Sequence, residues 1–260
     1  MSNVNSKGLA AERFQRIRDM LKKNGVMRVN KLSHGMRVSP ATIRRDLLQL
    51  DRQGLVRRVH GGAVCVETLL DEPLFDDKAA ISEKEKQKIA EKSLSLIKPN
   101  ETIFLDGGST VSALARLLTD MHNLTVVTNS LRVAGVFSGN GPKMILVGGE
   151  FRRLSQTIVG PLTHSLLDQL NVDTAFMGTI GISADDGMTT TDSREAYTKS
   201  MVMSHARQVV LLADSSKIGK VSFVKFGSSD NVDILITDSG ADKNELNKIR
   251  KKGITVIICR

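Results

Sequence analysis

The first quarter of the chain carries apolar residues at helical spacing. In the first predicted helix they fall at Phe14, Ile17, Met20 and Leu21. The Asn24-Gly25 pair favours the end of this helix, and residues 28–36 predict a second, shorter one. Because polar residues separate the apolar positions, each helix can bury one face and expose the other.

A third helix has the clearest beginning. Ser39 is a residue type whose side chain accepts a free backbone N–H, and Pro40 follows at the first helical position, where its missing donor costs nothing. Its buried face is predicted at Ile43, Leu47 and Leu50. Its outer face carries Thr42, Arg45, Gln49 and Arg52, with Arg44 at the flank. Gly54 ends this helix, and the residues up to Gly61-Gly62 predict a short hairpin.

Further along, short apolar runs alternate with helical patterns. The candidate strands are 102–106, 124–128, 143–148, 173–178, 209–214, 233–237 and 255–259. Ser82 and Glu85 match a capping box that would open a helix ending near residue 97. Nearly continuous apolar strands separated by helices predict a mostly parallel sheet covered on both faces, which makes the fold class α/β. We therefore expect a small helical domain at 9–65, a polar linker at 66–80 and an α/β domain at 81–260.

The charge of the chain is unevenly distributed. Of its 37 Lys and Arg, 14 lie in residues 1–66, which hold only four of the 28 Asp and Glu, so this part carries +10 and the rest −1. Such a division predicts a domain that binds a polyanion, joined to a nearly neutral one. The alternative is a solvated basic face without a partner.

Other classes of protein are disfavoured by composition. The chain has no apolar run long enough to span a membrane, and its first residues lack the apolar core of a secretory signal. Its two cysteines, Cys65 and Cys259, have no metal-ligand spacing, so we expect no disulfide, no metal and a cytoplasmic protein.

Three helices followed by a hairpin form the pattern of a winged helix-turn-helix, whose third helix can enter the major groove of DNA. Phosphate contacts would set the register, and base-edge contacts would give specificity. The expected DNA-binding residues are Ser39, Thr42, Arg44, Arg45 and Gln49 on the third helix, with Arg57, Arg58 and His60 in the hairpin. The alternatives are a solvated basic helix and a winged helix that contacts proteins.

Polar or glycine residues follow five of the predicted strands, where open α/β sheets bind ligands. The most informative is the turn Gly107-Gly108-Ser109-Thr110, because backbone N–H groups at a helix start can approach a phosphate closely. Asp106 could accept bonds from sugar hydroxyls, while Lys199 or Lys217 could supply positive charge. The alternatives are a plain tight turn at 107–110 and a surface ion pair between Glu195 and Lys199, which are four residues apart.

Residues 38–47 (VSPATIRRDL), then Leu50, Gly54, Leu55 and residues 58–63 (RVHGGA), resemble the DeoR family of bacterial regulators. One departure is that Lys31 and Ser33 stand in a helix that usually carries an acidic residue. The resemblance extends to an effector domain that is similar to sugar-phosphate isomerases and implies a phosphorylated sugar or polyol as ligand. It implies that 107–110 cradles the phosphate and that Asp106, Asn129, Glu195 and Lys199 face the sugar. The other matching positions are Thr128, Gly148, Gly149, the stretch 178–183 and the run 214–217, which ends in Lys217.

The expected function is transcriptional repression of a carbohydrate or polyol operon, relieved by the phosphorylated sugar. An activator of the same type is an alternative, since sequence does not separate the two. Another alternative is an isomerase with a DNA-binding appendage, in which Asp106, Asp192 and Glu195 would serve as acid–base groups. We expect double-stranded operator DNA as partner, a dimer or tetramer because helix-turn-helix proteins commonly read pseudo-palindromes, and no cofactor.

Overall fold

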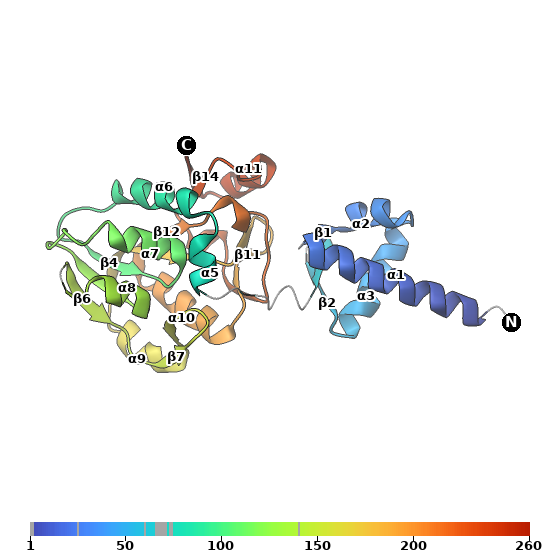
Figure 1. Cartoon of the computed structure of the whole chain (residues 1–260), viewed down its shortest axis with the longest axis horizontal. Helices are drawn as coiled ribbons and strands as arrows, with labels where there is room; N and C mark the ends of the chain where they lie inside the picture. Colours follow the sequence, from blue (N-terminus) through green and yellow to red (C-terminus); the bar gives the residue numbers. More distant parts are fainter. Residues whose placement is uncertain (1–2, 25, 60, 66–71, 73–74, 140) are drawn as a thin grey trace.

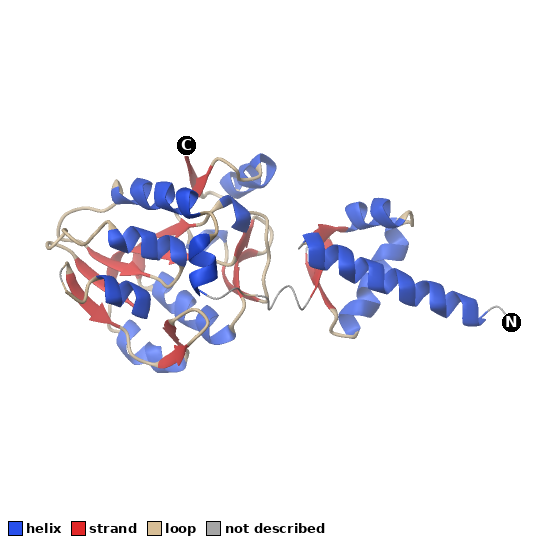
Figure 2. Cartoon of the chain, viewed as in Figure 1, coloured by secondary structure: helices blue, strands red, loops and turns tan. Residues whose placement is uncertain are grey.

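The chain forms a small N-terminal domain and a larger α/β domain (Figures 1 and 2). The computed structural model describes residues 3–24, 26–59, 61–65, 72, 75–139 and 141–260. Both predicted parts of the fold, a helix-turn-helix head and a parallel sheet domain, are confirmed.

The N-terminal domain contains three helices and a three-stranded antiparallel sheet. Its elements are α1 (Asn3–Asn24), β1 (Met27–Arg28), α2 (Val29–Met36), α3 (Pro40–Arg52), β2 (Val56–Val59) and β3 (Gly62–Cys65). The sheet order is β1-β3-β2, so the predicted hairpin is present and forms the wing. Strand β1 is too short for its pattern to reveal it.

One buried cluster holds the three helices and the wing together. The predicted core positions Ile43, Leu47 and Leu50 on α3 are all buried in it, together with Ile17 and Leu21 of α1. The spacing of these residues on one face explains why the helices pack there.

A charged contact also joins α1 to α3. The Arg13 guanidinium donates to both carboxylate oxygens of Asp46, one of them at 2.8 Å, and Asp46 is buried. This contact joins α3 to α1.

The α/β domain is built on a seven-stranded sheet in which every paired strand runs parallel to its neighbours. Its strands are β4 (Thr102–Leu105), β5 (Thr125–Thr128), β6 (Lys143–Leu146), β9 (Val172–Gly178), β12 (Ala206–Leu212), β14 (Ile234–Asp238) and β15 (Thr255–Cys259). Their order is β15-β14-β12-β9-β4-β5-β6. These are the seven strands that the apolar runs predict, with ends shifted by a few residues.

Helices cover both faces of this sheet. On one face lie α6 (Glu83–Leu94), α7 (Ser109–Arg116) and α8 (Leu131–Val136); on the other lie α9 (His164–Leu167), α10 (Ser193–Ser204) and α11 (Lys243–Lys251). Strand β4 shows the reason, because Ile103 and Leu105 enter one core while Phe104 enters the other. A strand buried on both faces reads as a continuous apolar run.

Smaller elements surround the sheet, and the sequence did not predict them. A hairpin pairs β7 (Glu150–Arg152) with β8 (Thr157–Val159), and a second antiparallel sheet has the order β10 (Gly181–Ser183), β11 (Gly187–Thr190), β13 (Val224–Gly227). Short 3-10 turns occur at η1 (Pro161–Thr163), η2 (Ser215–Lys217) and η3 (Ser229–Asn231).

The segment before α6 differs from expectation. The predicted capping box at Ser82 is wrong: Ser82 has a φ of 54° and its side chain makes no capping hydrogen bond. The Lys86 ammonium group, one turn into the helix, instead donates to the carbonyls of Lys78 and Ile81 and so holds the preceding turn. In addition, the stretch predicted as linker contains helix α5 (Phe75–Ala80), which contacts α7. The domain boundaries themselves stay a prediction.

Each domain contains one of the two cysteines as a buried, free thiol. Cys65 lies at the end of the wing in the N-terminal core, and Cys259 ends β15 beneath the helices of the α/β domain. Within the part of the chain that is described, no helix is long and apolar enough to cross a membrane.

Candidate functional site

The outer face of α3 presents the side chains expected to contact DNA. Arg44, Arg45 and Gln49 are exposed, and Thr42 is half-buried. These residues lie opposite the buried Ile43, as the helical spacing predicts. Arginine can donate two hydrogen bonds to the edge of guanine, and glutamine has one donor and one acceptor that match the edge of adenine.

Ser39 holds the beginning of α3. Its hydroxyl accepts the backbone N–H of Thr42 at 3.2 Å, and its Oγ lies 3.0 Å from the Thr42 hydroxyl. The predicted helix cap, with Pro40 at the first turn, is therefore confirmed. A contact of Ser39 or Thr42 with a phosphate stays a prediction.

The wing residues have different surroundings. The guanidinium of Arg57 lies over the ring of Phe223 in the α/β domain, 5.5 Å from its centre, and donates to the Phe223 carbonyl. Arg58 is exposed, and its backbone N–H donates to Asp51 at 3.3 Å. His60 lies outside the described residues. The structure thus leaves Arg58 open to solvent, whereas Arg57 already contacts the other domain.

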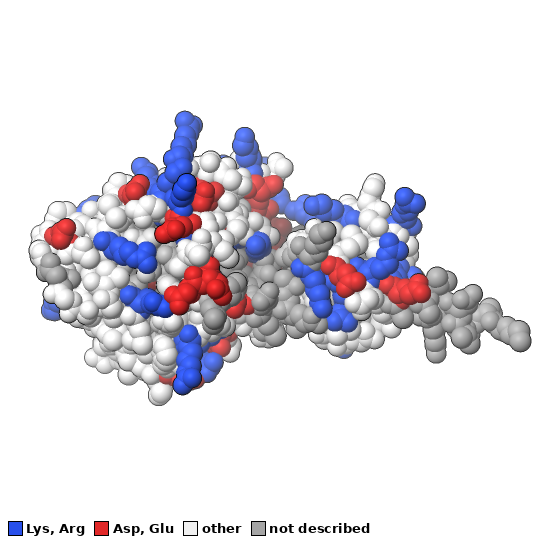
Figure 3. All heavy atoms as spheres, in the orientation of Figure 1, with Lys and Arg blue, Asp and Glu red and all other residues white. Residues whose placement is uncertain are grey.

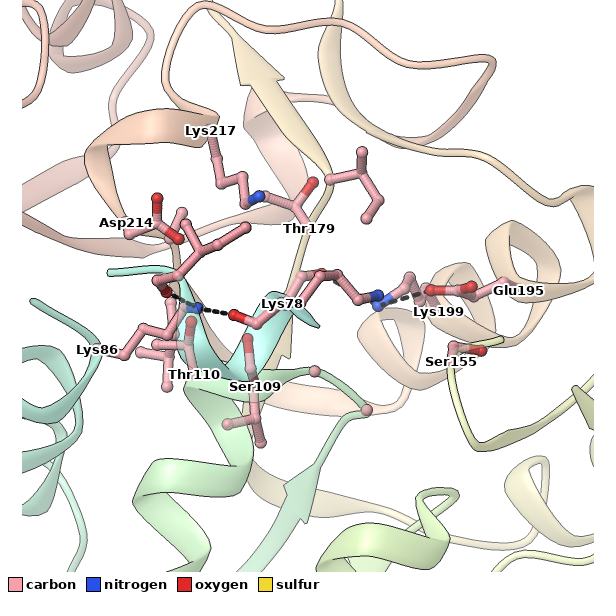
Figure 4. A pocket seen from close by; sticks show the side chains of 18 residues that line it. Lys78, Lys86, Ser109, Thr110, Ser155, Thr179, Glu195, Lys199, Asp214 and Lys217 are labelled. Carbon is pink, nitrogen blue, oxygen red and sulfur yellow. Dashed lines mark hydrogen bonds and ion pairs between the residues drawn. The ribbon is translucent and has the colours of Figure 1, made fainter. Parts of the chain in front are cut away.

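The second candidate site is a cavity at the carboxyl ends of β4, β9 and β12, which are neighbours in the sheet (Figure 4). It encloses about 740 Å³ of non-protein space, its open mouth included. Its polar lining comprises Lys78, Lys86, Gly107, Gly108, Ser109, Thr110, Ser155, Thr179, Glu195, Lys199, Asp214 and Lys217. This is the edge at which open α/β sheets bind ligands.

The glycines of the 107–110 turn are required by its geometry. A Cβ on Gly107 would lie 2.0 Å from the methyl group of Thr157, and Gly108 has a φ of 140°, which side-chain-bearing residues rarely adopt. Gly108 precedes α7 and supplies no side-chain cap. The first N–H groups of α7, at Ser109 and Thr110, are therefore available to an anion beside the cavity.

A buried charged group forms the back of the cavity. The Lys199 ammonium contacts the Asp106 carboxylate and lies 3.6 Å from the Glu195 carboxylate, and the Lys199 side chain is only 3% exposed. Asp106 also accepts the backbone N–H of Gly178 at 2.9 Å. Glu195 and Lys199 thus lie beneath the surface, which corrects the alternative of a solvated helix-surface pair.

Glu195 lines the cavity, and its carboxylate contacts the Arg152 guanidinium at 3.4 Å. Among the side chains that the structure describes, its Oε2 atom is buried without a hydrogen-bond partner. Burial raises the pKa of Glu195 above its ordinary value, while Lys199 and Arg152 oppose that rise. Such a carboxyl group can exchange hydrogen bonds with a ligand hydroxyl.

Three further lysines, Lys78, Lys86 and Lys217, line the cavity (Figure 4). Burial lowers the pKa of Lys86 and of Lys217, and the positive charge of Lys78 lowers both further. Asp214 counteracts this in part. Because these cations repel one another in a poorly solvated space, an anion bound among them would be stabilised.

Five of the predicted effector residues do not line the cavity: Asp106, Thr128, Asn129, Gly148 and Gly149. Asp106 contacts Lys199, which does line the cavity. The hydroxyl of Thr128 donates to the backbone carbonyl of Leu105 at 2.6 Å. The side-chain amide of Asn129 donates to the backbone carbonyl of Ile158 at 2.9 Å. Both side chains thus bind neighbouring segments of backbone. Thr128 and Asn129 lie at the end of β5 and the two glycines follow β6, and both strands lie to one side of the three strands that form the cavity.

Four charged residues around the cavity were missed by sequence reasoning: Glu72, Lys78, Lys86 and Arg152. Lys86 lies three and four residues before Ile89 and Ala90, so the helical spacing places it on the same face of the predicted helix as these apolar residues. Glu72 and Lys78 fall in an irregular acidic stretch, and Arg152 lies in a three-residue strand, so no periodicity marks them. In the described part of the chain, no cluster of three or more His, Cys, Asp or Glu side chains could hold a metal ion.

Asp192 holds the start of α10, the helix that carries Glu195 and Lys199. It accepts the backbone N–H groups of Arg194 and Glu195 at 2.9 and 3.1 Å. Burial acts to raise the pKa of Asp192, but these bonds together with the Arg194 and Arg152 side chains lower it to about 2.

Asp192→Ala should therefore destabilise the protein by about 1 kcal/mol at pH 7 through loss of this cap. Since the pKa of Asp192 is lowered on folding, its contribution is present above the ordinary value of 3.8 and is lost as the pH falls toward 2. Urea unfolding at pH 7 and pH 3 checks this prediction. An Asp192→Ala deficit that stays constant with pH would contradict it.

The sign of the surface charge differs between the two domains. On the face shown in Figure 3, Lys and Arg side chains lie over the helix-turn-helix domain with some acidic groups among them, and basic and acidic groups also mingle over the α/β domain. This agrees with the +10 of residues 1–66 and the −1 of the remainder.

The fold defines a helix-turn-helix protein with a C-terminal α/β domain that has a cavity at the edge of its sheet. Residues 13–68 match the "DeoR-like helix-turn-helix domain", and residues 81–239 match the "DeoR C terminal sensor domain". The chain belongs to the DeoR family, which confirms the resemblance drawn from its sequence.

Relatives match almost over their whole length. The chain is 35% identical to the HTH-type transcriptional regulator GlpR of Haloferax volcanii, over 96% of this chain and 98% of that one. It is 34% identical to the glycerol-3-phosphate regulon repressor of Escherichia coli, over 95% and 98%. Among solved structures, ribose 5-phosphate isomerase A of Methanocaldococcus jannaschii matches with a TM-score of 0.40 and 20% identity, over 52% of this chain and 54% of that one. That distant likeness carries no functional argument.

Proposed function

We propose that this protein is a transcriptional repressor that binds operator DNA through α3 and the wing, and releases it when a phosphorylated sugar or polyol occupies the cavity. The observation that carries the proposal is the lysine-lined cavity beside the start of α7, in a chain whose other domain is a helix-turn-helix. Relatives named as transcriptional regulators, one of them a glycerol-3-phosphate regulon repressor, support it.

The cavity offers complementary groups at its two ends. The N–H groups of Ser109 and Thr110, with Lys86 and Lys217, would hold the phosphate. The buried Glu195 carboxyl group would form hydrogen bonds with the hydroxyls of the sugar. Ligand binding can change DNA affinity only if the two forms of the protein bind the ligand unequally.

We propose no catalytic role for the carboxylates of the cavity. Asp106 is paired with Lys199 and with the Gly178 N–H, and Asp192 caps α10, so both are engaged in holding the structure. The sign of regulation, the oligomeric state and a cytoplasmic location stay predictions.

Fluorescence anisotropy with promoter DNA at fixed salt tests the proposal. We expect at least one compound among glycerol 3-phosphate, fructose 1-phosphate, glucose 6-phosphate and ribose 5-phosphate to raise the Kd for DNA about tenfold, within the usual range of coupling between two sites. The unphosphorylated parent of each compound is the matched control. The sensing role is refuted if no compound changes the Kd, and the phosphate assignment is refuted if a parent acts equally well.

A further inference from the structure

Glu72 is a buried carboxylate in the stretch between the two domains. Its side chain is fully buried, and it accepts hydrogen bonds from Lys78 at 2.7 Å, from Arg152 at 2.8 Å and from the Thr191 hydroxyl. Burial acts to raise the pKa of Glu72, but these partners together lower it below its ordinary value. Glu72 is therefore ionised at neutral pH and attached to the α/β domain by charge.

Lys78 belongs to two sites at once. Its ammonium group holds Glu72, and its side chain also lines the cavity (Figure 4). The carbonyl of Lys78 accepts a hydrogen bond from Lys86, a second cation of the cavity. Helix α5, which carries Lys78, is thus the element through which the stretch between the domains contacts the candidate ligand site.

Arg152 provides a second connection between Glu72 and the cavity. One of its terminal nitrogens donates to Glu72, and the other lies 3.4 Å from the Glu195 carboxylate, which lines the cavity. The Nε of Arg152 lies 3.4 Å from Asp192. Of the two cations that hold Glu72, Lys78 therefore lines the cavity itself, while Arg152 contacts Glu195, which lines it.

We propose that Glu72 and a bound anion compete for Lys78, so that occupation of the cavity loosens Glu72 from the α/β domain. This inference rests on the proposed function, because it requires an anionic ligand. Residues 66–71 connect Glu72 to the wing in the sequence. The attachment of Glu72 is thus the step at which an occupied cavity acts on the DNA-binding domain.

Competition has a reciprocal consequence. If the anion weakens the bonds of Glu72, then removing the Glu72 charge must tighten binding of the anion by the same factor. Removing the Glu72 charge must also reduce the effect of the ligand on DNA binding. A carboxylate with a purely structural role would change stability and leave anion affinity alone.

The test compares Glu72→Gln with the wild-type full-length protein, with inorganic phosphate as the probe. We expect calorimetry to give a Kd for phosphate about fivefold lower in Glu72→Gln, the low end of common coupling factors. Amide hydrogen exchange across residues 72–80 should accelerate when phosphate binds to the wild type. Asp76→Asn is the matched control, since Asp76 is an exposed carboxylate on α5, the helix that carries Lys78, lies 2.6 Å from Arg132, and should leave the phosphate Kd unchanged.

The outcomes separate this inference from the proposed function. An equal phosphate Kd in wild type and Glu72→Gln overturns the competition while leaving anion sensing intact. No phosphate binding to the wild type overturns both. If Glu72→Gln fails to fold, Thr191→Val carries the test, because it removes one hydrogen bond from Glu72 and Thr191 does not line the cavity. Tighter phosphate binding in Thr191→Val supports the competition, and an unchanged Kd overturns it.

Discussion

Lys199→Met should lower the free energy of unfolding of the α/β domain by about 3–5 kcal/mol, the usual cost of removing one partner from a buried ion pair. Both Asp106 and Lys199 are buried, so the substitution leaves the Asp106 carboxylate in the core with, among the described residues, the Gly178 N–H as the remaining hydrogen-bond partner of that side chain. Urea unfolding measures the loss. Tyr197, the single tyrosine in a chain without tryptophan, lies on the same helix and its fluorescence follows this domain.

The double variant Asp106→Asn, Lys199→Met is the control for charge. It removes both members of the pair and keeps an oxygen that can accept the Gly178 N–H, so we expect it to regain more than half of the lost stability. If Lys199→Met alone unfolds at the same urea concentration as the wild type, the Asp106–Lys199 pair contributes no net stability. Because Lys199→Met is expected to be less stable, the stability of a Lys199 variant must be measured together with its response to ligand.

Arg45→Ala should reduce discrimination between operator and unrelated DNA by about 1–3 kcal/mol, the usual value of a good base contact. Arg45 is exposed on the side of α3 that faces away from the buried Ile43 and Leu47. Ratios of the Kd for operator and for scrambled duplex, measured at several salt concentrations, test this prediction.

Arg207→Ala is the matched control, because it removes the same charge from an arginine that is 81% exposed on the α/β domain. Its operator preference should equal that of the wild type. If Arg45→Ala lowers affinity for both duplexes by the same factor, Arg45 contacts phosphate and the base contact is refuted.

Helices and strands could be predicted from the sequence where the spacing of their apolar residues reflects burial of a whole face. The strand around Phe104 is buried on both sides and reads as an apolar run, and Ser39 caps α3 through a bond to Thr42 only three residues away. Both are consequences of local sequence, or of a periodicity long enough to be recognised.

What the sequence did not reveal depends on contacts between distant segments. Glu72 is held by Arg152 and Thr191, which are 80 and 119 residues away, and no local pattern reports such partners. Ser82 adopts its left-handed conformation where the chain turns between α5 and α6, against a locally good capping pattern. Of the seven strands of the large sheet, the three central ones contribute their ends to the cavity, and which strands are central depends on the strand order.

The two buried thiols allow the opening of each domain to be followed separately. Cys65 is shielded by the helix-turn-helix core, and Cys259 is shielded by the helices over the large sheet. A thiol reagent can modify either sulfur only when that domain opens, so pulse labelling followed by mass spectrometry gives an opening rate for each. Operator DNA should protect Cys65 more strongly, and a ligand in the cavity should protect Cys259.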